Sequence, residues 1–166
     1  MTRSRSAARL PIASFPVTRT VTTRWADNDM YGHMNNAVHY QLFDSVINGW
    51  IAEEAPSAVS SRAALGVVAE SGCSYFAEIS YPDDVIVGLR VAHLGRSSVV
   101  YDLGLFPLPR QQGAQPGAMA ARGRWVHVYV DSGTRQSVPI PDDIRHVLEG
   151  AVTDRRTGSV TESSPT

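Results

Sequence analysis

The segment Asn36–Glu54 reads NAVHYQLFDSVINGWIAEE and decides the fold of this chain. Its apolar residues recur every four positions, which is the spacing of one face of an α-helix. Two such rows run side by side: Val38, Leu42, Val46 and Trp50, and next to them Phe43, Ile47 and Ile51. A helix that is apolar around so much of its circumference belongs inside a sheet that wraps around it, and not at a surface.

Strand-forming sequence lies on both sides of this helix. Phe15–Trp25 is rich in valine and threonine and predicts a first strand. After a linker at Pro56–Ala64, apolar and polar residues alternate, which predicts a strand with one buried face. We expect that face to carry Val67, Ala69, Cys73, Tyr75, Ala77, Ile79 and Tyr81. Further strands are expected at Val85–Leu94, Ser98–Phe106 and Met119–Val130, and a short helix at Pro141–Glu149.

This order of elements, one strand, a long helix, four strands and a short helix, predicts an α+β fold. Four consecutive strands with short connections form an antiparallel meander, and the long helix must pack on it. We place this single domain at residues 15–150. A flexible tail is expected at residues 1–14 and a disordered tail at residues 151–166, since Thr153–Thr166 contains a single aliphatic residue.

Composition narrows the classes of function. The 15 basic and 16 acidic residues leave a net charge of −1, so no overall field attracts nucleic acid or a membrane surface. Cys73 is the only cysteine, which excludes an internal disulfide and favours a reducing, cytoplasmic compartment. No apolar run approaches the ~18 residues of a membrane helix, and the Arg- and Ser-rich N-terminus lacks the apolar core of a secretory signal. Every basic residue is arginine, which is typical of a high-GC bacterial genome.

Polar residues are densest between the first strand and the helix, at Trp25–Asn36, where the sequence is WADNDMYGHMNN. Its two aspartates and its glycine match three positions of a calcium-binding EF-hand loop. The position that needs a bidentate glutamate is Val38, so this interpretation fails. His33 and His39 offer ligands to a transition metal, but no second ligand cluster supports such a site, and we predict no metal.

Two interpretations of the segment stay open from its residues alone. Asn35 is a good helix N-cap and Asp27 is a turn former, so the loop can be purely structural. Alternatively, the unpaired amide of Asn36 at the helix start polarises a carbonyl group, and the carboxylate of Asp29 lies beside it because Gly32 lets the loop fold back. A polarised carbonyl next to a carboxylate is an arrangement for acyl transfer.

The segment resembles the hotdog-fold thioesterases of the 4-hydroxybenzoyl-CoA thioesterase family, in which D-x-D-x-x-G-H-x-N-N closes the first strand and opens the central helix. The resemblance covers about Val17–Leu148 and implies an antiparallel sheet wrapped around one long central helix. It also implies that Asp29 is the catalytic carboxylate, as nucleophile or general base, and that the Asn36 backbone amide polarises the thioester carbonyl. Contacts with the substrate are then expected from Tyr31, Gly32, His33 and Asn35.

The resemblance further implies the substrate and the assembly. That family hydrolyses acyl-CoA or aryl-CoA thioesters to the free acid and CoA, without a cofactor. It binds the CoA phosphates with basic residues near a strand turn, which here aligns with the turn that holds Arg96. A homodimer or homotetramer is expected, with each active site bordered by two subunits. Candidates to line the acyl pocket are Tyr31, Tyr40, Trp50 and Phe76.

Two other functions were weighed for such a fold. Hotdog hydratases and dehydratases carry an aspartate, an asparagine-proline pair and a histidine five positions after the aspartate. Here the fifth position after Asp27 is Gly32, and the segment contains no proline. A non-catalytic acyl-CoA-binding protein keeps the fold and loses the chemistry, but here Asp29 and the helix-opening motif are intact. Steady release of free thiol from CoA thioesters distinguishes a hydrolase from both.

Overall fold

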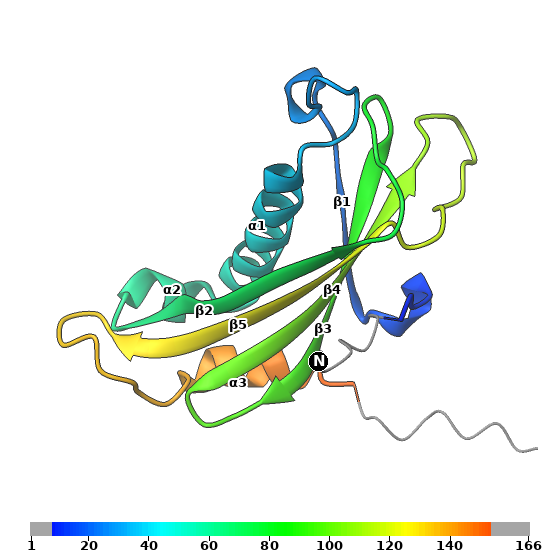
Figure 1. Cartoon of the computed structure of the whole chain (residues 1–166). Coiled ribbons are helices and arrows are strands. Elements are labelled where there is room, and N and C mark those ends of the chain that lie inside the picture. Colours follow the sequence, from blue (N-terminus) through cyan, green and yellow to red (C-terminus); the bar gives the residue numbers. More distant parts are fainter. Residues whose placement is uncertain (1–7, 154–166) are drawn as a thin grey trace, which may run out of the picture.

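Five antiparallel strands form one sheet in the computed structural model, which describes residues 8–153. The strands are β1 (Val17–Val21), β2 (Ala64–Tyr75), β3 (Asp84–Leu94), β4 (Ser98–Leu108) and β5 (Ala121–Asp131). Their order in the sheet is β1-β3-β4-β5-β2 (Figure 1). The expected meander is confirmed for β3, β4 and β5, but the prediction that β2 continues it is wrong. β2 pairs along its length with β5, and the chain then crosses to the other side of the sheet to begin β3.

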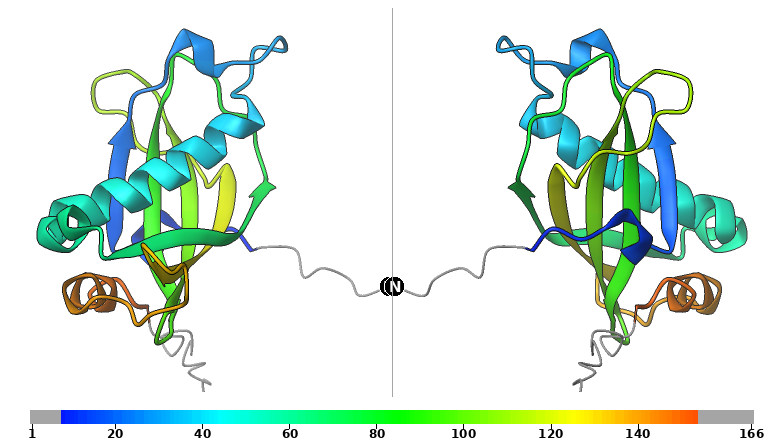
Figure 2. Two further views of the ribbon diagram at one scale, coloured as in Figure 1. Left: turned by 90° about the vertical axis from the view of Figure 1, so that its left-hand side faces the viewer. Right: turned by 90° about the vertical axis from the view of Figure 1, so that its right-hand side faces the viewer.

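One long helix, α1 (Asn36–Glu54), crosses the inner face of the sheet, and its bounds are those expected from the sequence (Figures 1 and 2). The linker expected after it contains a short helix, α2 (Pro56–Ser61), which proline begins. A third helix, α3 (Asp142–Glu149), has two aspartates in its first turn, where the positive end of the helix dipole favours them. The sheet wrapped around one central helix is therefore confirmed.

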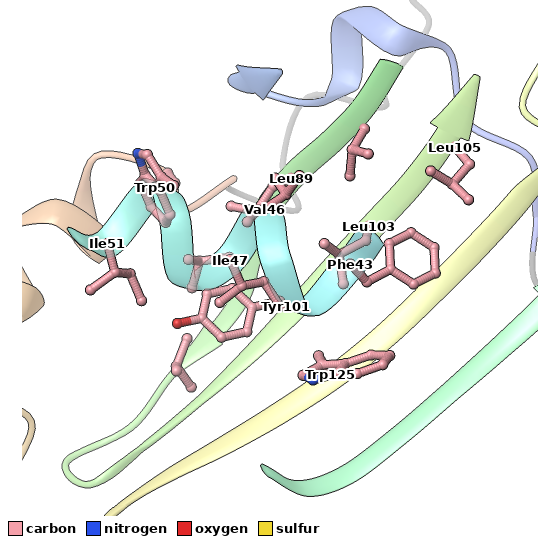
Figure 3. Packing of buried hydrophobic residues seen from close by; sticks show 14 of the residues in the cluster. Phe43, Val46, Ile47, Trp50, Ile51, Leu89, Tyr101, Leu103, Leu105 and Trp125 are labelled. Carbon is pink, nitrogen blue, oxygen red and sulfur yellow. The ribbon is translucent and has the colours of Figure 1, made fainter. Parts of the chain in front are cut away.

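The core lies between α1 and the inner face of the sheet, as Figure 3 shows. Phe43 and Ile47 of α1 are fully buried there. The helix approaches the sheet closely because β5 has a glycine at the contact: a Cβ atom at Gly123 would lie 2.6 Å from the Phe43 ring. Burial of each large apolar side chain stabilises the fold by roughly 1.5–3 kcal/mol. The side chains that complete this contact in Figure 3 are Val46, Trp50, Ile51, Leu89, Tyr101, Leu103, Leu105 and Trp125.

The chain before β1 crosses the outer face of the sheet, opposite α1 (Figure 2, right). It contains a 3₁₀ turn at Ile12–Ser14, and Phe15 packs edge-on against Phe106 at 5.8 Å between ring centroids. Arg122 donates a hydrogen bond to the Ala8 carbonyl at 2.7 Å. Residues 8–14 thus contact the sheet and belong to the folded domain rather than to the expected tail. Residues 1–7 and 154–166 lie outside the described part of the chain.

β2 is an edge strand, and its side chains are more exposed than the alternating pattern predicts. Val67 and Tyr75, both expected on the buried face, are 37% and 44% exposed, and Cys73 is only half-buried. A β-bulge between Val68 and Glu70 also shifts the register, so the alternation does not hold along the strand. The prediction of a buried face is therefore wrong for most of β2, because no further strand covers this edge within one chain.

Candidate active site

The loop from Asn28 to Met34 folds back on itself between β1 and α1. Its two ends form an isolated antiparallel bridge, and the Asp29 amide donates to the His33 carbonyl at 2.7 Å. Gly32 makes the return possible because its φ of 82° lies in the left-handed region, which glycine enters without strain. The loop therefore holds Asp29 close to the start of the helix.

Backbone amides fix one oxygen of the Asp29 carboxylate. Oδ1 accepts hydrogen bonds from the amides of Tyr31 (2.8 Å) and His33 (3.3 Å). No hydrogen bond to Oδ2 is formed by the residues that the structure describes. The carboxylate is thus oriented through one oxygen and presents the other, with its lone pairs, to a ligand or to water.

The start of α1 is capped so that one amide is left over. The Asn35 side chain accepts from the Ala37 amide at 2.9 Å, and the Asn35 amide donates to the Asp27 carbonyl at 2.9 Å. Between them, the Asn36 amide has no acceptor within residues 8–153. A free amide at the positive end of a helix dipole can polarise a carbonyl oxygen.

Asp27 and Asn28 support the loop rather than face its cavity. Asp27 is buried and accepts from the backbone amide and the guanidinium of Arg24, both at 2.7 Å. Burial pushes the pKa of Asp27 upward, but the hydrogen bonds from Arg24 outweigh it and hold the pKa below its ordinary value. Asn28 Oδ1 accepts from the Tyr81 amide at 3.1 Å and so ties the loop to the chain that precedes β3.

A cavity of about 340 Å³ opens beside the loop. Its walls come from the loop, the first turn of α1 and the chain that follows β2. At its mouth, the His33 imidazole lies 3.1 Å from the Glu78 carboxylate. The lining residues are Asp29, His33, Met34, Asn36, His39, Tyr75, Phe76, Ala77, Glu78 and Ile79. Asp29 and the first residue of α1, Asn36, therefore share one cavity.

The structure brings together three of the predicted site residues in this cavity: Asp29, His33 and Asn36. Three others, Tyr31, Gly32 and Asn35, shape the loop and the helix cap without lining it. Of the acyl-pocket candidates, Phe76 lines the cavity, Tyr31 is exposed, and Tyr40 and Trp50 pack against or within the core.

Sequence analysis did not assign His39, Tyr75 or Glu78 to the site. The spacing of His39 could have predicted its place, because a residue three positions after Asn36 lies on the same face of the helix. No local signal existed for Tyr75 and Glu78, because Tyr75 reaches the loop from the end of β2 and Glu78 from the chain that follows it.

Arg96 does not join this cavity within one chain. It lies exposed in the turn between β3 and β4, and Figure 1 shows that this turn is at the end of the sheet opposite the loop before α1. The turn is held in place by Arg145, which donates to the Arg96 carbonyl at 2.8 Å, and by the Ile140 amide, which donates to it at 2.9 Å. Its expected contact with CoA phosphates stays a prediction that requires a second subunit.

A larger cavity, of about 540 Å³, lies on the outer face of the sheet and involves β2, β4 and β5. Its charged groups are already paired: Asp102 accepts from Arg90 at 2.8 Å and from Arg122 at 2.7 Å, and Arg124 forms an ion pair with Glu70. Neither Asp29 nor Asn36 lines it. We therefore place the chemistry in the smaller cavity.

Residues 8–153 contain neither a cluster of metal-ligating side chains nor a helix that could span a membrane. No three side chains of histidine, cysteine, aspartate or glutamate gather in an arrangement that could hold a metal ion. No helix in this range has the length and hydropathy needed to cross a membrane.

An antiparallel sheet wrapped around one long helix is the hotdog fold. The profile of the thioesterase-like superfamily matches residues 23–148, and the chain belongs to this family. The family and the fold together make it a thioesterase.

Solved structures agree with this assignment. The PA5185 protein of Pseudomonas aeruginosa is 36% identical, with a TM-score of 0.80 over 88% of this chain and 98% of that one. A thioesterase of Thermus thermophilus, solved with coenzyme A and Zn, is 28% identical, with a TM-score of 0.66 over 83% and 95%. A 1,4-dihydroxy-2-naphthoyl-CoA thioesterase of Synechocystis, at 18% identity and a TM-score of 0.67 over 79% and 93%, shares the fold. No curated protein matches the chain.

Proposed function

We propose that this chain hydrolyses acyl-CoA thioesters to the free acid and CoA. One observation carries the proposal: Asp29, whose carboxylate keeps Oδ2 unpaired, and Asn36, the first residue of α1, line the same cavity of about 340 Å³. Membership of the thioesterase-like superfamily supports thioester hydrolysis, and the Thermus relative solved with coenzyme A supports CoA as the thiol.

The Asn36 amide has the role of the electrophilic group in this proposal. A thioester carbonyl oxygen that accepts its hydrogen bond gains negative charge as the carbonyl carbon is attacked. A fixed donor aimed at that oxygen stabilises the transition state more than the ground state, and therefore raises kcat. The N-cap bonds of Asn35 keep the donor in place.

Asp29 has the role of nucleophile or general base. As nucleophile, Oδ2 forms a bond to the carbonyl carbon, the C–S bond breaks, and CoA leaves as a thiolate that takes a proton from water. Water then hydrolyses the mixed anhydride. As general base, the carboxylate accepts a proton from a water molecule that attacks the same carbon directly; the C–S bond then breaks, and the CoA thiolate takes up that proton.

A single turnover in ¹⁸O-labelled water tests the nucleophile route, because label in the Asp29 carboxylate can arise only from the mixed anhydride. With excess enzyme, the nucleophile route leaves label in the Asp29 carboxylate when water attacks the aspartyl carbon of the anhydride, and the general-base route labels only the released acid. Peptide mass spectrometry of the loop reads the result. Oδ2 can take either role, because it has no hydrogen-bond partner within residues 8–153.

We infer that the active form is a homodimer, or a dimer of such dimers, joined through β2. This edge strand exposes two adjacent apolar side chains, Val67 and Val68, at 37% and 47%. Exposed apolar edges pair readily with a further strand, and symmetric dimers are the commonest assemblies. Light scattering should give twice or four times the chain mass, and Val68→Asp should shift the population toward monomer. A wild-type monomer that is fully active would overturn this inference.

Such a dimer offers a place for Arg96. Antiparallel pairing of two β2 strands reverses the second sheet, so the β3–β4 turn of the partner lies at the end of the sheet that holds Asp29 in the first chain. The turn is two or three strands from the β2 edge, roughly 10–15 Å at the usual strand spacing. That separation suits a phosphate contact at the far end of a CoA molecule whose thioester lies in the cavity.

Substitution of Arg96 by alanine tests this placement. An exposed arginine–phosphate contact is charge-assisted but screened by salt. We expect KM for acyl-CoA to rise about 5–30-fold with kcat nearly unchanged, because ground and transition states share the contact. An acyl-pantetheine thioester, which lacks the nucleotide, should be hydrolysed equally by both proteins. An equal loss on both substrates would make Arg96 structural.

A panel of acyl-CoA substrates tests the function itself. Free thiol is followed with a chromogenic disulfide while the acyl group is varied in size and polarity. Multiple turnovers with at least one member support a hydrolase. Binding without turnover would indicate an acyl-CoA-binding protein, and addition of water across a double bond without thiol release would indicate a hydratase.

A further inference from the structure

His39 is a buried polar residue of the cavity that the proposed mechanism does not use. Its side chain is 3% exposed, and the ring lines the cavity together with Asp29 and Asn36. The ring of Tyr75 packs edge-on against it at 5.0 Å between centroids. The nitrogens of an imidazole in this position form hydrogen bonds with the protein, with water in the cavity or with a ligand that replaces this water.

The hydrogen bonds of His39 fix which ring nitrogen carries the proton. Nδ1 lies 3.2 Å from the Asn35 carbonyl oxygen. A carbonyl oxygen can only accept, so Nδ1 carries the hydrogen and donates it. Burial lowers the pKa of His39, which keeps the ring neutral near pH 7. Nε2 is then a hydrogen-bond acceptor, and no donor within the described chain is paired with it.

The cavity has an exposed mouth and a buried floor. Asp29, His33 and Glu78 stand at the mouth, whereas Met34 and Ile79 on the floor are about as buried as the imidazole. CoA is too large and too charged for about 340 Å³, so its arm must leave through the mouth. The acyl group of a bound thioester therefore occupies the floor, which is the side of His39.

The helix also sets how far His39 lies from the reacting carbonyl. It follows Asn36 by three residues, which is a rise of about 4.5 Å along α1. Helical side chains lean toward the helix N-terminus, so the imidazole leans back toward the amide that is proposed to hold the carbonyl oxygen. A group that reaches Nε2 must then be attached close to the thioester.

We propose that His39 selects acyl groups with a hydroxyl on the second or third carbon, whose hydrogen is donated to Nε2. The proposal rests on the thioesterase function proposed above and adds the class of acyl group. The floor is otherwise apolar, with Met34 and Ile79. A plain acyl group would cover Nε2 without pairing it, and a buried acceptor left unpaired is penalised more than a formed hydrogen bond is rewarded.

Matched substrate pairs test the proposal: 3-hydroxybutyryl-CoA against butyryl-CoA, and 2-hydroxybenzoyl-CoA against benzoyl-CoA. For the wild type, kcat/KM should favour the hydroxylated member of at least one pair by about 5–30-fold. His39→Phe should abolish this ratio, mainly through the hydroxylated substrate. His39→Gln, whose side-chain oxygen can take the place of Nε2, should restore most of it.

His127→Phe is the matched control, because His127 is also a buried histidine but does not line the cavity. It should keep the wild-type ratio. A wild type that cleaves thioesters without preference in either pair would overturn the role of His39 and leave the proposed function intact. Equal loss on both members of a pair in His39→Phe would also overturn it. Failure to release thiol from any substrate would instead overturn the proposed function.

Discussion

Replacement of Asp29 by asparagine separates the chemistry of the loop from its structure. Oδ1 accepts the Tyr31 and His33 amides at 2.8 and 3.3 Å, and the side-chain oxygen of an asparagine can accept both. Oδ2 has no partner among the described residues, so its exchange for an NH₂ group breaks no contact of the folded chain. We expect the free energy of unfolding to change by less than ~0.5 kcal/mol.

The same replacement removes the carboxylate that serves as nucleophile or general base. A positioned base contributes about 10²–10⁴-fold to a rate. We therefore expect kcat on the best thioester to fall by about 10³-fold, while KM changes by less than about threefold. The assay is thiol release under multiple turnover, with intact-mass spectrometry to exclude deamidation of the new asparagine back to aspartate.

Asp27→Asn is the matched control for this experiment. Asp27 lies two residues away, but it pairs with Arg24 and does not line the cavity. The control should lose some stability and keep most of its kcat. The reasoning is refuted if Asp29→Asn keeps more than about a tenth of the wild-type kcat, or if Asp27→Asn loses as much.

Three further predictions concern the loop, the core and the buried histidines. Gly32→Ala places a side chain at a φ of 82°, which costs about 1–2 kcal/mol of backbone strain. Relaxation of this strain displaces Asp29, so kcat/KM should fall about 10–100-fold. Unchanged kinetics would contradict the role of this turn. Gly123→Ala puts a Cβ atom 2.6 Å from the Phe43 ring, so calorimetry should show a loss of about 1–3 kcal/mol. Burial lowers the pKa of His127 below 6.5, although Asp44 opposes this. As the pH falls through about 6.5, His127 of the unfolded chain becomes protonated while His127 of the folded chain stays neutral, so the free energy of unfolding decreases. Urea midpoints at about pH 7.5 and about pH 5.5 should therefore differ less for His127→Phe than for the wild type.

The central helix could be predicted from sequence because its information is local. Apolar residues at helical spacing run from Val38 to Ile51, and Asn35 marks the start, so the predicted and observed bounds of α1 agree. The same holds for the loop: the acid, the glycine and the cap lie within one short segment. The family resemblance then indicated which of these residues face the substrate, and the cavity brings Asp29 and Asn36 together.

Features that depend on the path of the chain could not be predicted in this way. Alternation in β2 indicates a strand with two different faces but not whether a neighbour covers either of them. Val67 is exposed because β2 is the edge strand of the sheet, and the strand order cannot be read from the sequence of β2 itself. Tyr75 reaches the cavity because β2 ends beside the loop, and Glu78 because the chain then crosses the sheet. Arg96 was aligned with a turn of the right kind, but the distance from that turn to Asp29 is not encoded locally.

The loop that holds Asp29 relies on main-chain groups, which has a consequence for how such enzymes diversify. The carboxylate is oriented by the amides of Tyr31 and His33, which every residue except proline supplies. Met30 and Tyr31 are 88% and 75% exposed, so their side chains can be exchanged without moving the carboxylate. Gly32 and Asn35 are required for their own shape or bonding, and Asp27 and Asn28 for the side-chain bonds that support the loop from outside the cavity. Mutation can thus change the side chains of Met30 and Tyr31, one and two residues from Asp29, while the position of the carboxylate and the reaction stay the same.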